Sequence, residues 1–436
     1  MRQIYCLSFA FFLISFFSKL SYSNSADLQQ PQESSSDAEN KDFIITSKYG
    51  DLKFSGYFQP QFQWIESKGA PSFGGGDFEP NSNNRFKIRR GRLKAEYSNK
   101  NSKGEEVSYF VLQFDGNEKG VSIRDFWGRY SENKWKLFHV KIGMMPRPFG
   151  DEIQRSSSIR ESPERGRMSQ IIMNSERDLG FSLTFNPRAE SSQWKWLAIE
   201  AGVYNGQGIS GPIEYDSYKD FIGRISAKNL SFFNQKATFS FGASILWGHI
   251  DSPTDSIYIL KNQKMVLDDS GNSSPAIKRY FGLDAQLLIP NKVGNTQFRA
   301  EYIRGTQTAN ANSSVTPRSI YHSGTKQPYP LYSRQFDGAY FYFIQHLNSW
   351  NHQVVVKYDW YNPQRLVNGM ELSQDNGFSM ADVAYHTLGL GYIYHINTQL
   401  KVTLYYDRIW NEKTGIINAS QDFKDDLLTC RLQFKF

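Results

Sequence analysis

Basic side chains recur at two-residue spacing in several segments of the chain. The run RRGRLKAEY places Arg90, Arg92 and Lys94 at alternate positions. An arginine guanidinium presents a rigid fork of donors that matches the oxygens of phosphate and carboxylate groups. Several such groups in series can hold an anion weakly at each step, so that it enters and still leaves. The residues that we assign to this anion track are Arg90, Arg92, Lys94, Arg129, Lys141, Arg147, Arg155, Arg160 and Arg224.

Carboxylates occupy similar alternating positions, and they support a second interpretation. Arginines held in place by neighbouring carboxylates produce a field across a pore without binding an ion at successive sites. The sequence leaves both interpretations open: a track that is specific for phosphate, and a general pore with a mild preference for anions. The carboxylates concerned are Asp178, Asp220, Asp284, Glu301, Asp359 and Asp407.

Spacing of two residues is the spacing of one face of a β-strand, so strands must position these side chains. The segment Leu179–Phe185 has its four large apolar residues at alternate positions, and segments of the same kind recur from Leu52 to Phe436. Counted along the chain, they predict about 16 strands. A charged side chain costs about 2–4 kcal/mol on the lipid face of a barrel strand at the membrane midplane. The charged faces should therefore point away from lipid.

The connections between the predicted strands alternate between long and short. Residues 144–177, 250–277, 306–335 and 362–383 form long connections, whereas most of the intervening ones are short. An outer-membrane barrel has short turns on one side and long loops on the other. The mean hydropathy of −0.55 excludes a helical membrane protein, while 15% aromatic residues is compatible with aromatic girdles. The sequence predicts an all-β fold: a transmembrane antiparallel β-barrel.

The long connection after Phe138–Gly143 carries many charges of both signs. Long polar loops in compact domains usually have a function, and we expect this one to fold into the lumen as a constriction loop. We place Arg147, Arg155 and Arg160 at the rim of the pore. Arg177 and Asp178 are expected to form a structural pair.

The two ends of the chain carry export signals. Residues 1–23 have a charged start, an apolar run and small residues near the end, which predicts a signal peptide. Residues 24–50 read as a polar periplasmic leader, and residues 51–436 as the outer-membrane barrel. The final strand ends on Phe436 with apolar residues at every second position, which resembles the terminal signature of outer-membrane barrels. Cys430 is the one cysteine after the signal peptide, so no intramolecular disulfide is expected.

Several motifs in fixed order resemble a known family. "KIGMMPRPFGDE", "RSSS", "ERG" and "RDLG" follow one another, with "RRGRLKAEY" before them and "AGVYNGQG" and "YKDFIGRIS" after them. This order is similar to that of the phosphate-selective porin O/P family of outer-membrane porins. The resemblance implies a loop that constricts the pore, phosphate as a solute and a homotrimer.

We therefore expect a passive outer-membrane porin for small anionic solutes such as phosphate. Its expected surroundings are outer-membrane lipid and lipopolysaccharide, with no nucleic acid, no cofactor and no metal. G-x-S-x-G, H-E-x-x-H, P-loop and EF-hand patterns are all missing from the sequence, so no enzyme activity is expected. Two alternatives stay open: a general or oligosaccharide diffusion porin without a phosphate site, and an adhesin or receptor that uses loops 250–277 and 306–335.

Overall fold

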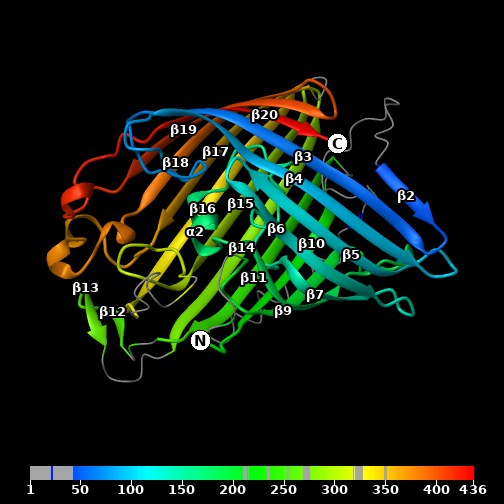
Figure 1. Cartoon of the computed structure of the whole chain (residues 1–436), viewed down its shortest axis with the longest axis horizontal. Coiled ribbons are helices and arrows are strands. Elements are labelled where there is room, and N and C mark those ends of the chain that lie inside the picture. Colours follow the sequence, from blue (N-terminus) through cyan, green and yellow to red (C-terminus); the bar gives the residue numbers. More distant parts are fainter. Residues whose placement is uncertain are drawn as a thin grey trace.

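Sixteen antiparallel strands close into a barrel in the computed structural model (Figure 1). The structure describes residues 21–22, 43–209, 214, 216–232, 236–252, 254, 256–268, 275–317, 319, 328–347 and 351–436. Each barrel strand pairs with its neighbours along the ring, and β20 returns to pair with β3, which closes it. The barrel strands are β3 (Gly50–Ile65), β4 (Asn84–Lys100), β5 (Glu106–Asn117), β6 (Gly120–Ser131), β7 (Phe138–Pro146), β8 (Arg177–Phe185), β9 (Leu197–Tyr204), β10 (Asp220–Phe232), β11 (Ala237–Ile250), β14 (Ala276–Asn291), β15 (Gly294–Ala309), β16 (Leu331–Leu347), β17 (His352–Asn362), β18 (Tyr385–His395), β19 (Leu400–Asn411) and β20 (Leu427–Lys435).

The fold class and the predicted number of barrel strands are confirmed. A closed barrel leaves no open edge, so every strand in the wall has two hydrogen-bonded neighbours. The predicted two-sidedness is also present. The connections 66–83, 147–176, 205–219, 251–275, 310–330, 363–384 and 412–426 lie at one end, which we call the long-loop end, and the other end is the short-turn end. The turn between β5 and β6 is short although it lies at the long-loop end.

Several short elements lie outside the barrel wall. β2 (Phe43–Ser47) falls within the predicted leader and pairs with the start of β3, and β1 (Ser21–Tyr22) pairs with β10. The predicted connection 250–277 contains a hairpin of β12 (Ile257–Lys261) and β13 (Lys264–Asp268). Short helices occur in three of the long connections: α2 (Arg167–Ile172), η1 (Gly369–Glu371), η2 (Gln374–Asn376), η3 (Met380–Asp382) and η4 (Ile417–Ala419). Within the described ranges, none of the helices is long and apolar enough to cross a membrane.

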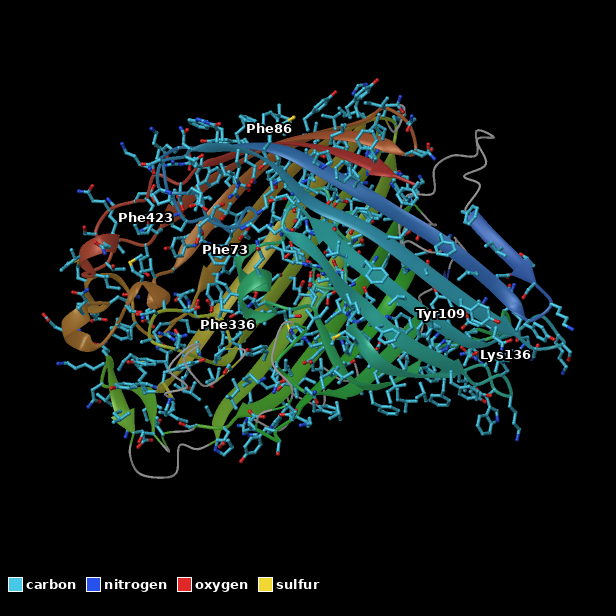
Figure 2. All side chains as sticks on the ribbon, in the orientation of Figure 1. Phe73, Phe86, Tyr109, Lys136, Phe336 and Phe423 are labelled. Carbon is cyan, nitrogen blue, oxygen red and sulfur yellow. The ribbon has the colours of Figure 1, made fainter. Side chains whose placement is uncertain are left out.

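The two faces of the wall differ as alternation requires. Leu179, Phe181 and Leu183 of β8 are 46–48% exposed and point outward, whereas Ser182 between them is buried. Phe86 of β4 is 87% exposed and projects from the outer surface (Figure 2). The outer face is thus rich in apolar side chains, and the polar and charged residues line the lumen.

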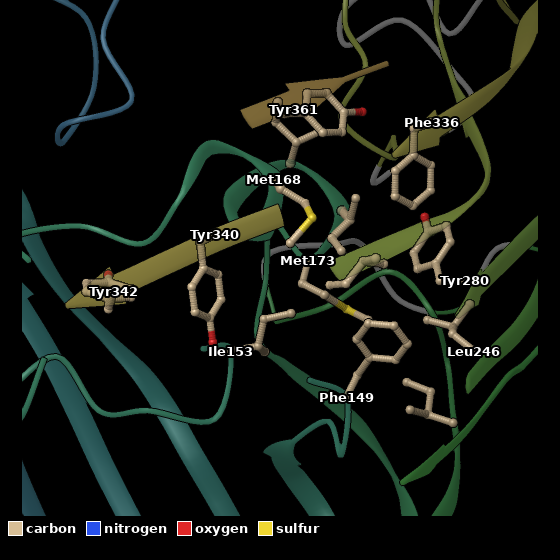
Figure 3. Packing of buried hydrophobic residues seen from close by; sticks show 14 of the residues in the cluster. Phe149, Ile153, Met168, Met173, Leu246, Tyr280, Phe336, Tyr340, Tyr342 and Tyr361 are labelled. Carbon is tan, nitrogen blue, oxygen red and sulfur yellow. The ribbon is translucent and has the colours of Figure 1, made fainter. Parts of the chain in front are cut away.

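An apolar cluster inside the barrel joins the connection 147–176 to the wall (Figure 3). Phe149 meets Tyr280 of β14 edge to face, with ring centroids 6.2 Å apart. Burying a side chain of this size contributes about 1.5–3 kcal/mol, so several together hold the segment firmly. The residues that this connection supplies to the cluster are Phe149, Ile153, Met168, Ile171, Ile172 and Met173.

Candidate functional site

The connection 147–176, which we call the constriction loop, meets the wall through its backbone as well. The N–H groups of Asp151 and Glu152 donate to Glu301 Oε2 on β15, at 3.2 and 3.0 Å. Gly150 precedes them with φ +62°, a backbone conformation that glycine adopts without strain. A Cβ at this position would collide with the Glu301 carboxylate. Glycine is therefore needed where the loop docks, and the predicted fold of this loop into the lumen is confirmed.

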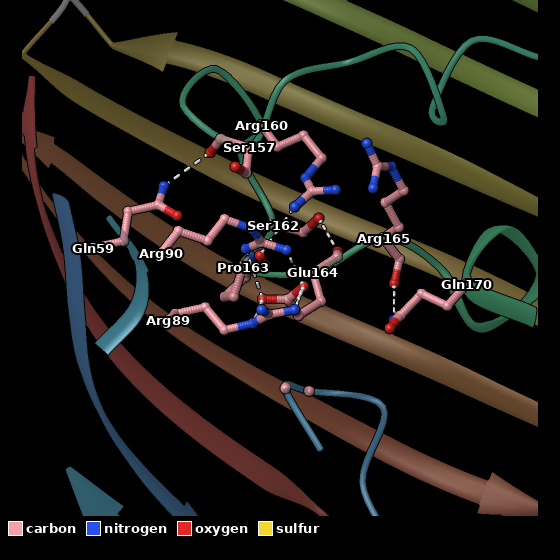
Figure 4. Close-up of polar contacts among 12 residues, drawn as sticks. Gln59, Arg89, Arg90, Ser157, Arg160, Ser162, Pro163, Glu164, Arg165 and Gln170 are labelled. Atoms are coloured by element: carbon pink, nitrogen blue, oxygen red, sulfur yellow. Dashed lines mark hydrogen bonds and ion pairs between the residues drawn. The ribbon is translucent and has the colours of Figure 1, made fainter. Parts of the chain in front are cut away.

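Glu164 joins the other side of the loop to the wall through guanidinium groups (Figure 4). Arg89 donates to it through Nε and Nη2 at 2.8 and 2.9 Å, and Arg90 through Nη1 and Nη2 at 3.2 and 3.0 Å. Arg431 of β20 donates through Nη2 at 2.9 Å. Burial alone would raise the pKa of Glu164, but these three guanidinium groups and Arg160 outweigh it and hold the pKa well below its usual value. Four cations thus surround one carboxylate.

A bulge in β4 brings Arg89 and Arg90 to the same carboxylate. Gln59 of β3 faces Arg90 and Pro60 faces Ile88, so Arg89 has no partner on β3. A bulge of this kind interrupts alternation and lets two consecutive side chains point to one face. Sequence reasoning missed Arg89 because it assumed unbroken alternation. Pro60 was the available signal, since a proline inside a strand cannot donate to the ladder.

Arg160 is the cation of this group whose donors are least used. It is 4% exposed, and Nε and Nη1 have no hydrogen-bond partner among the described residues, while Nη2 donates to the Pro163 carbonyl at 3.5 Å. Lys401 of β19 contacts the same segment of the loop. It donates to the Ser158 carbonyl at 3.1 Å and forms no ion pair with a described residue. Buried donors are normally hydrogen-bonded, so the unused donors of Arg160 can serve a ligand. We call Arg89, Arg90, Arg160, Lys401 and Arg431 the basic cluster, and its arrangement suits an oxyanion.

Most of the other predicted anion-binding residues are paired with carboxylates instead. They are spread along the lumen, with Arg129 and Lys141 facing each other across β6 and β7 near the short-turn end. Such pairing fits the second interpretation of the sequence, in which paired charges on the wall produce an electric field across the pore without binding an ion at successive sites. The pairs are Arg92 with Asp115 at 2.9 Å, Lys94 with Glu96 at 2.6 Å, Arg129 with Glu106 at 2.7 Å, Lys141 with Glu200 at 2.5 Å, Arg155 with Asp151 at 2.7 Å and Arg224 with Asp284 at 2.5 Å.

The contacts of Arg147 and Arg177 show how the two ends of the loop are held. Arg147 is buried and donates to the Ser175 carbonyl, so it ties the two ends of the loop together. The predicted pair of Arg177 with Asp178 is wrong. Arg177 Nε donates to Asp125 of β6 at 3.1 Å, and Asp178 accepts from the N–H of Gly206 at 2.7 Å. Consecutive strand residues point in opposite directions, which separates their side chains.

Comparisons with known proteins agree with this architecture. No protein-family model matches the chain, and no curated protein matches its sequence. Solved structures match its fold. The outer membrane channel DcaP of Acinetobacter baumannii is 11% identical, with a TM-score of 0.53 over 90% of this chain and 99% of that one. The anion-selective porin from Comamonas acidovorans is 10% identical, with a TM-score of 0.51 over 89% and 100%.

A third match is the loop L8 deletion mutant of OmpT, an outer membrane protein of Vibrio cholerae. It is 8% identical, with a TM-score of 0.50 over 89% of this chain and 100% of that one. The chain has the fold of these barrels. At such low identity the likeness concerns the fold, and the solute has to be argued from the residues themselves.

Proposed function

We propose that the chain is a passive channel of a bacterial outer membrane that conducts small anions. The apolar outer face and the closed ring of strands support a barrel in lipid, because each strand of the wall is hydrogen-bonded to two neighbours within the barrel. The predicted signal peptide supports export. The outer face would contact lipid and, at the long-loop end, lipopolysaccharide.

The basic cluster is the observation that carries the anion preference. Arg89, Arg90 and Arg431 pair with one carboxylate, Glu164, and the buried Arg160 has donors that no described residue uses. In a narrow lumen a field of this sign is screened less than at an open surface. An entering anion meets both net positive charge and free hydrogen-bond donors.

Phosphate is the anion that the motif resemblance suggests, and guanidinium forks fit its oxygens. One structural relative is named as an anion-selective porin, from Comamonas acidovorans, and this name is consistent with a preference for anions in general. The paired cations along the rest of the lumen favour the alternative, a general pore with a mild preference for anions. Phosphate block of the current separates the two.

The test is the reversal potential of the purified channel in a potassium chloride gradient. We expect a chloride preference in the wild type and a smaller one in Arg160→Gln, which keeps hydrogen-bonding capacity but loses the charge. Arg408→Gln is the matched control, because Arg408 is 46% exposed at the outer surface and pairs with Asp426 at 2.8 Å. It should leave the preference unchanged.

A wild-type channel without chloride preference, or an Arg160→Gln channel identical to the wild type, would contradict the proposal. Millimolar phosphate should reduce the chloride current of the wild type if phosphate binds at the cluster, and the reduction should disappear in Arg160→Gln. Absence of this block with chloride preference intact would favour the general pore.

A further inference from the structure

A small cavity lies beside the constriction loop, toward the long-loop end. The loop supplies one side, including Glu164 and Arg167, and strands β17 to β20 supply the other. Phe73 of the connection between β3 and β4 contributes an aromatic surface. Because Glu164 lines this cavity and also binds the basic cluster, the cavity and the cluster adjoin at that residue.

The far wall of the cavity carries a carboxylate that is not committed to any described residue. Asp407 of β19 lines the cavity, and neither a hydrogen bond nor an ion pair within 4 Å joins it to the part of the chain that the structure describes. The strand partner of Asp407 is Gly389, which has no side chain to cover it. Asp359 of β17 lines the same cavity.

Tyr405 provides a second, independent sign of a ligand. Its side chain is 1% exposed, it lines the cavity, and its hydroxyl has no hydrogen-bond partner within the described residues. A Cβ at Gly389 would collide with this hydroxyl, so the phenol extends toward the residue opposite Asp407. Buried hydroxyls are normally hydrogen-bonded. The Tyr405 hydroxyl can both donate and accept, so it suits a polar group of a ligand that is held beside the Asp407 carboxylate.

The cations around the cavity are occupied by other groups. Lys357 pairs with Asp359 at 3.1 Å, and Arg165 pairs with Glu176. The Arg167 guanidinium lies between two aromatic rings, 3.6 Å from the centroid of Tyr385 and 4.5 Å from that of Phe73. The backbone N–H of Arg167 donates to Asp359 Oδ1 at 3.2 Å. Glu164 and Asp359 are paired, so among the described residues Asp407 is the carboxylate of this cavity that remains available to a solute.

We propose that the cavity binds the ammonium group of a small zwitterionic solute whose carboxylate lies on the basic cluster. Asp407 supplies the counter-charge, the Tyr405 hydroxyl accepts one N–H, and Arg160 receives the carboxylate. A simple anion is attracted by the basic cluster alone and a simple cation by Asp407 alone, whereas a molecule with both charges is attracted at each end.

This inference rests on the proposed anion channel, and it narrows the solute class to amino acids and short amino-carboxylates. The probe is 4-aminobutanoate, compared with butanoate and butylammonium, each applied to the wild-type channel in a planar bilayer. We expect 4-aminobutanoate to halve the chloride current at a concentration at least tenfold lower than either single-charge analogue requires.

Two variants locate the ammonium site. Asp407→Asn should raise the half-blocking concentration of 4-aminobutanoate about tenfold and leave that of butanoate unchanged. Tyr405→Phe keeps the ring but removes the hydroxyl, and it should weaken the same block by a smaller factor. Asp375→Asn is the matched control, because Asp375 is exposed in the loop between β17 and β18 and should behave as the wild type.

The outcomes separate this inference from the proposed function. Equal block by 4-aminobutanoate and butanoate, with chloride preference retained, overturns the zwitterion site and leaves the anion channel standing. The zwitterion site is also overturned if 4-aminobutanoate blocks the Asp407→Asn channel at the same concentration as the wild type. If no ion passes at all, the proposed function fails, and calorimetric titration of the detergent-solubilised protein with the same three probes still decides whether the site exists.

Discussion

Replacement of Glu164 by glutamine tests whether this carboxylate anchors the constriction loop. The wild-type side chain is 8% exposed and accepts five hydrogen bonds, between 2.8 and 3.2 Å long, from Arg89, Arg90 and Arg431. The glutamine is similar in size but carries no charge. Removing one partner of a buried ion pair typically costs about 3–5 kcal/mol, because the remaining charge stays buried without compensation.

The barrel itself should survive this change. The apolar contacts of Phe149 and Ile153 before this segment, and of Met168 after it, do not involve Glu164. We therefore expect the segment around Ser157 and Glu164 to move away from β3 and β4 while the rest of the loop stays docked. Loss of the negative charge should also increase chloride preference, since the guanidinium groups are no longer neutralised.

Single-channel recording in planar bilayers measures both effects. The glutamine variant should show larger fluctuations of the open current and a reversal potential shifted toward chloride. Glu190→Gln is the control, because the Glu190 side chain is fully exposed and its nearest cation, Lys195, is 3.8 Å away. A Glu164→Gln channel as quiet as the wild type, with the same reversal potential, would show that the loop does not depend on this carboxylate.

Three further predictions follow from particular contacts. Replacing Gly150 by alanine should lower the free energy of unfolding by about 1–3 kcal/mol, because a positive φ is strained for residues with a Cβ and Glu301 fills the space that the Cβ would need. The control is Gly104→Ala, with φ +77° and nothing within 4 Å of its Cβ, which should cost less. Equal unfolding midpoints for the two variants would refute this prediction. Because the pKa of Glu164 is lowered in the folded protein, its ion pairs stabilise the loop fully above the unfolded pKa of about 4.3 and lose this contribution as the pH falls through the lowered folded value. Current noise should thus be constant from about pH 8 to 5 and rise below about pH 4, and a rise already at pH 6 would point to a different titrating group. The homotrimer implied by the motif resemblance should appear as a heat-sensitive slow band in electrophoresis of unheated protein, and cross-linking that yields monomer alone would oppose it.

Local alternation in the sequence determined the architecture of the barrel. Side chains of a strand alternate with a period of two, whatever the neighbouring strand is, so the apolar and polar faces of β8 can be read without knowing its partners. The lengths of the connections are equally local, and they assign the two ends. The positions of Arg90, Arg92 and Lys94 on the inner face followed from the same rule.

Contacts between distant parts of the chain were decided by tertiary structure alone. The Glu164 carboxylate meets Arg431 because the loop crosses the lumen and β20 returns to β3, and neither path is written in a local pattern. A bulge opposite Pro60 moved Arg89 to the inner face. The open carboxylate of Asp407 depends on a glycine in the neighbouring strand, so strand register had to be known first. Charge pairing across a lumen is set by register and loop path. The sequence therefore identified Arg90 and Arg160 of the basic cluster, but it could not say which cations pair with carboxylates.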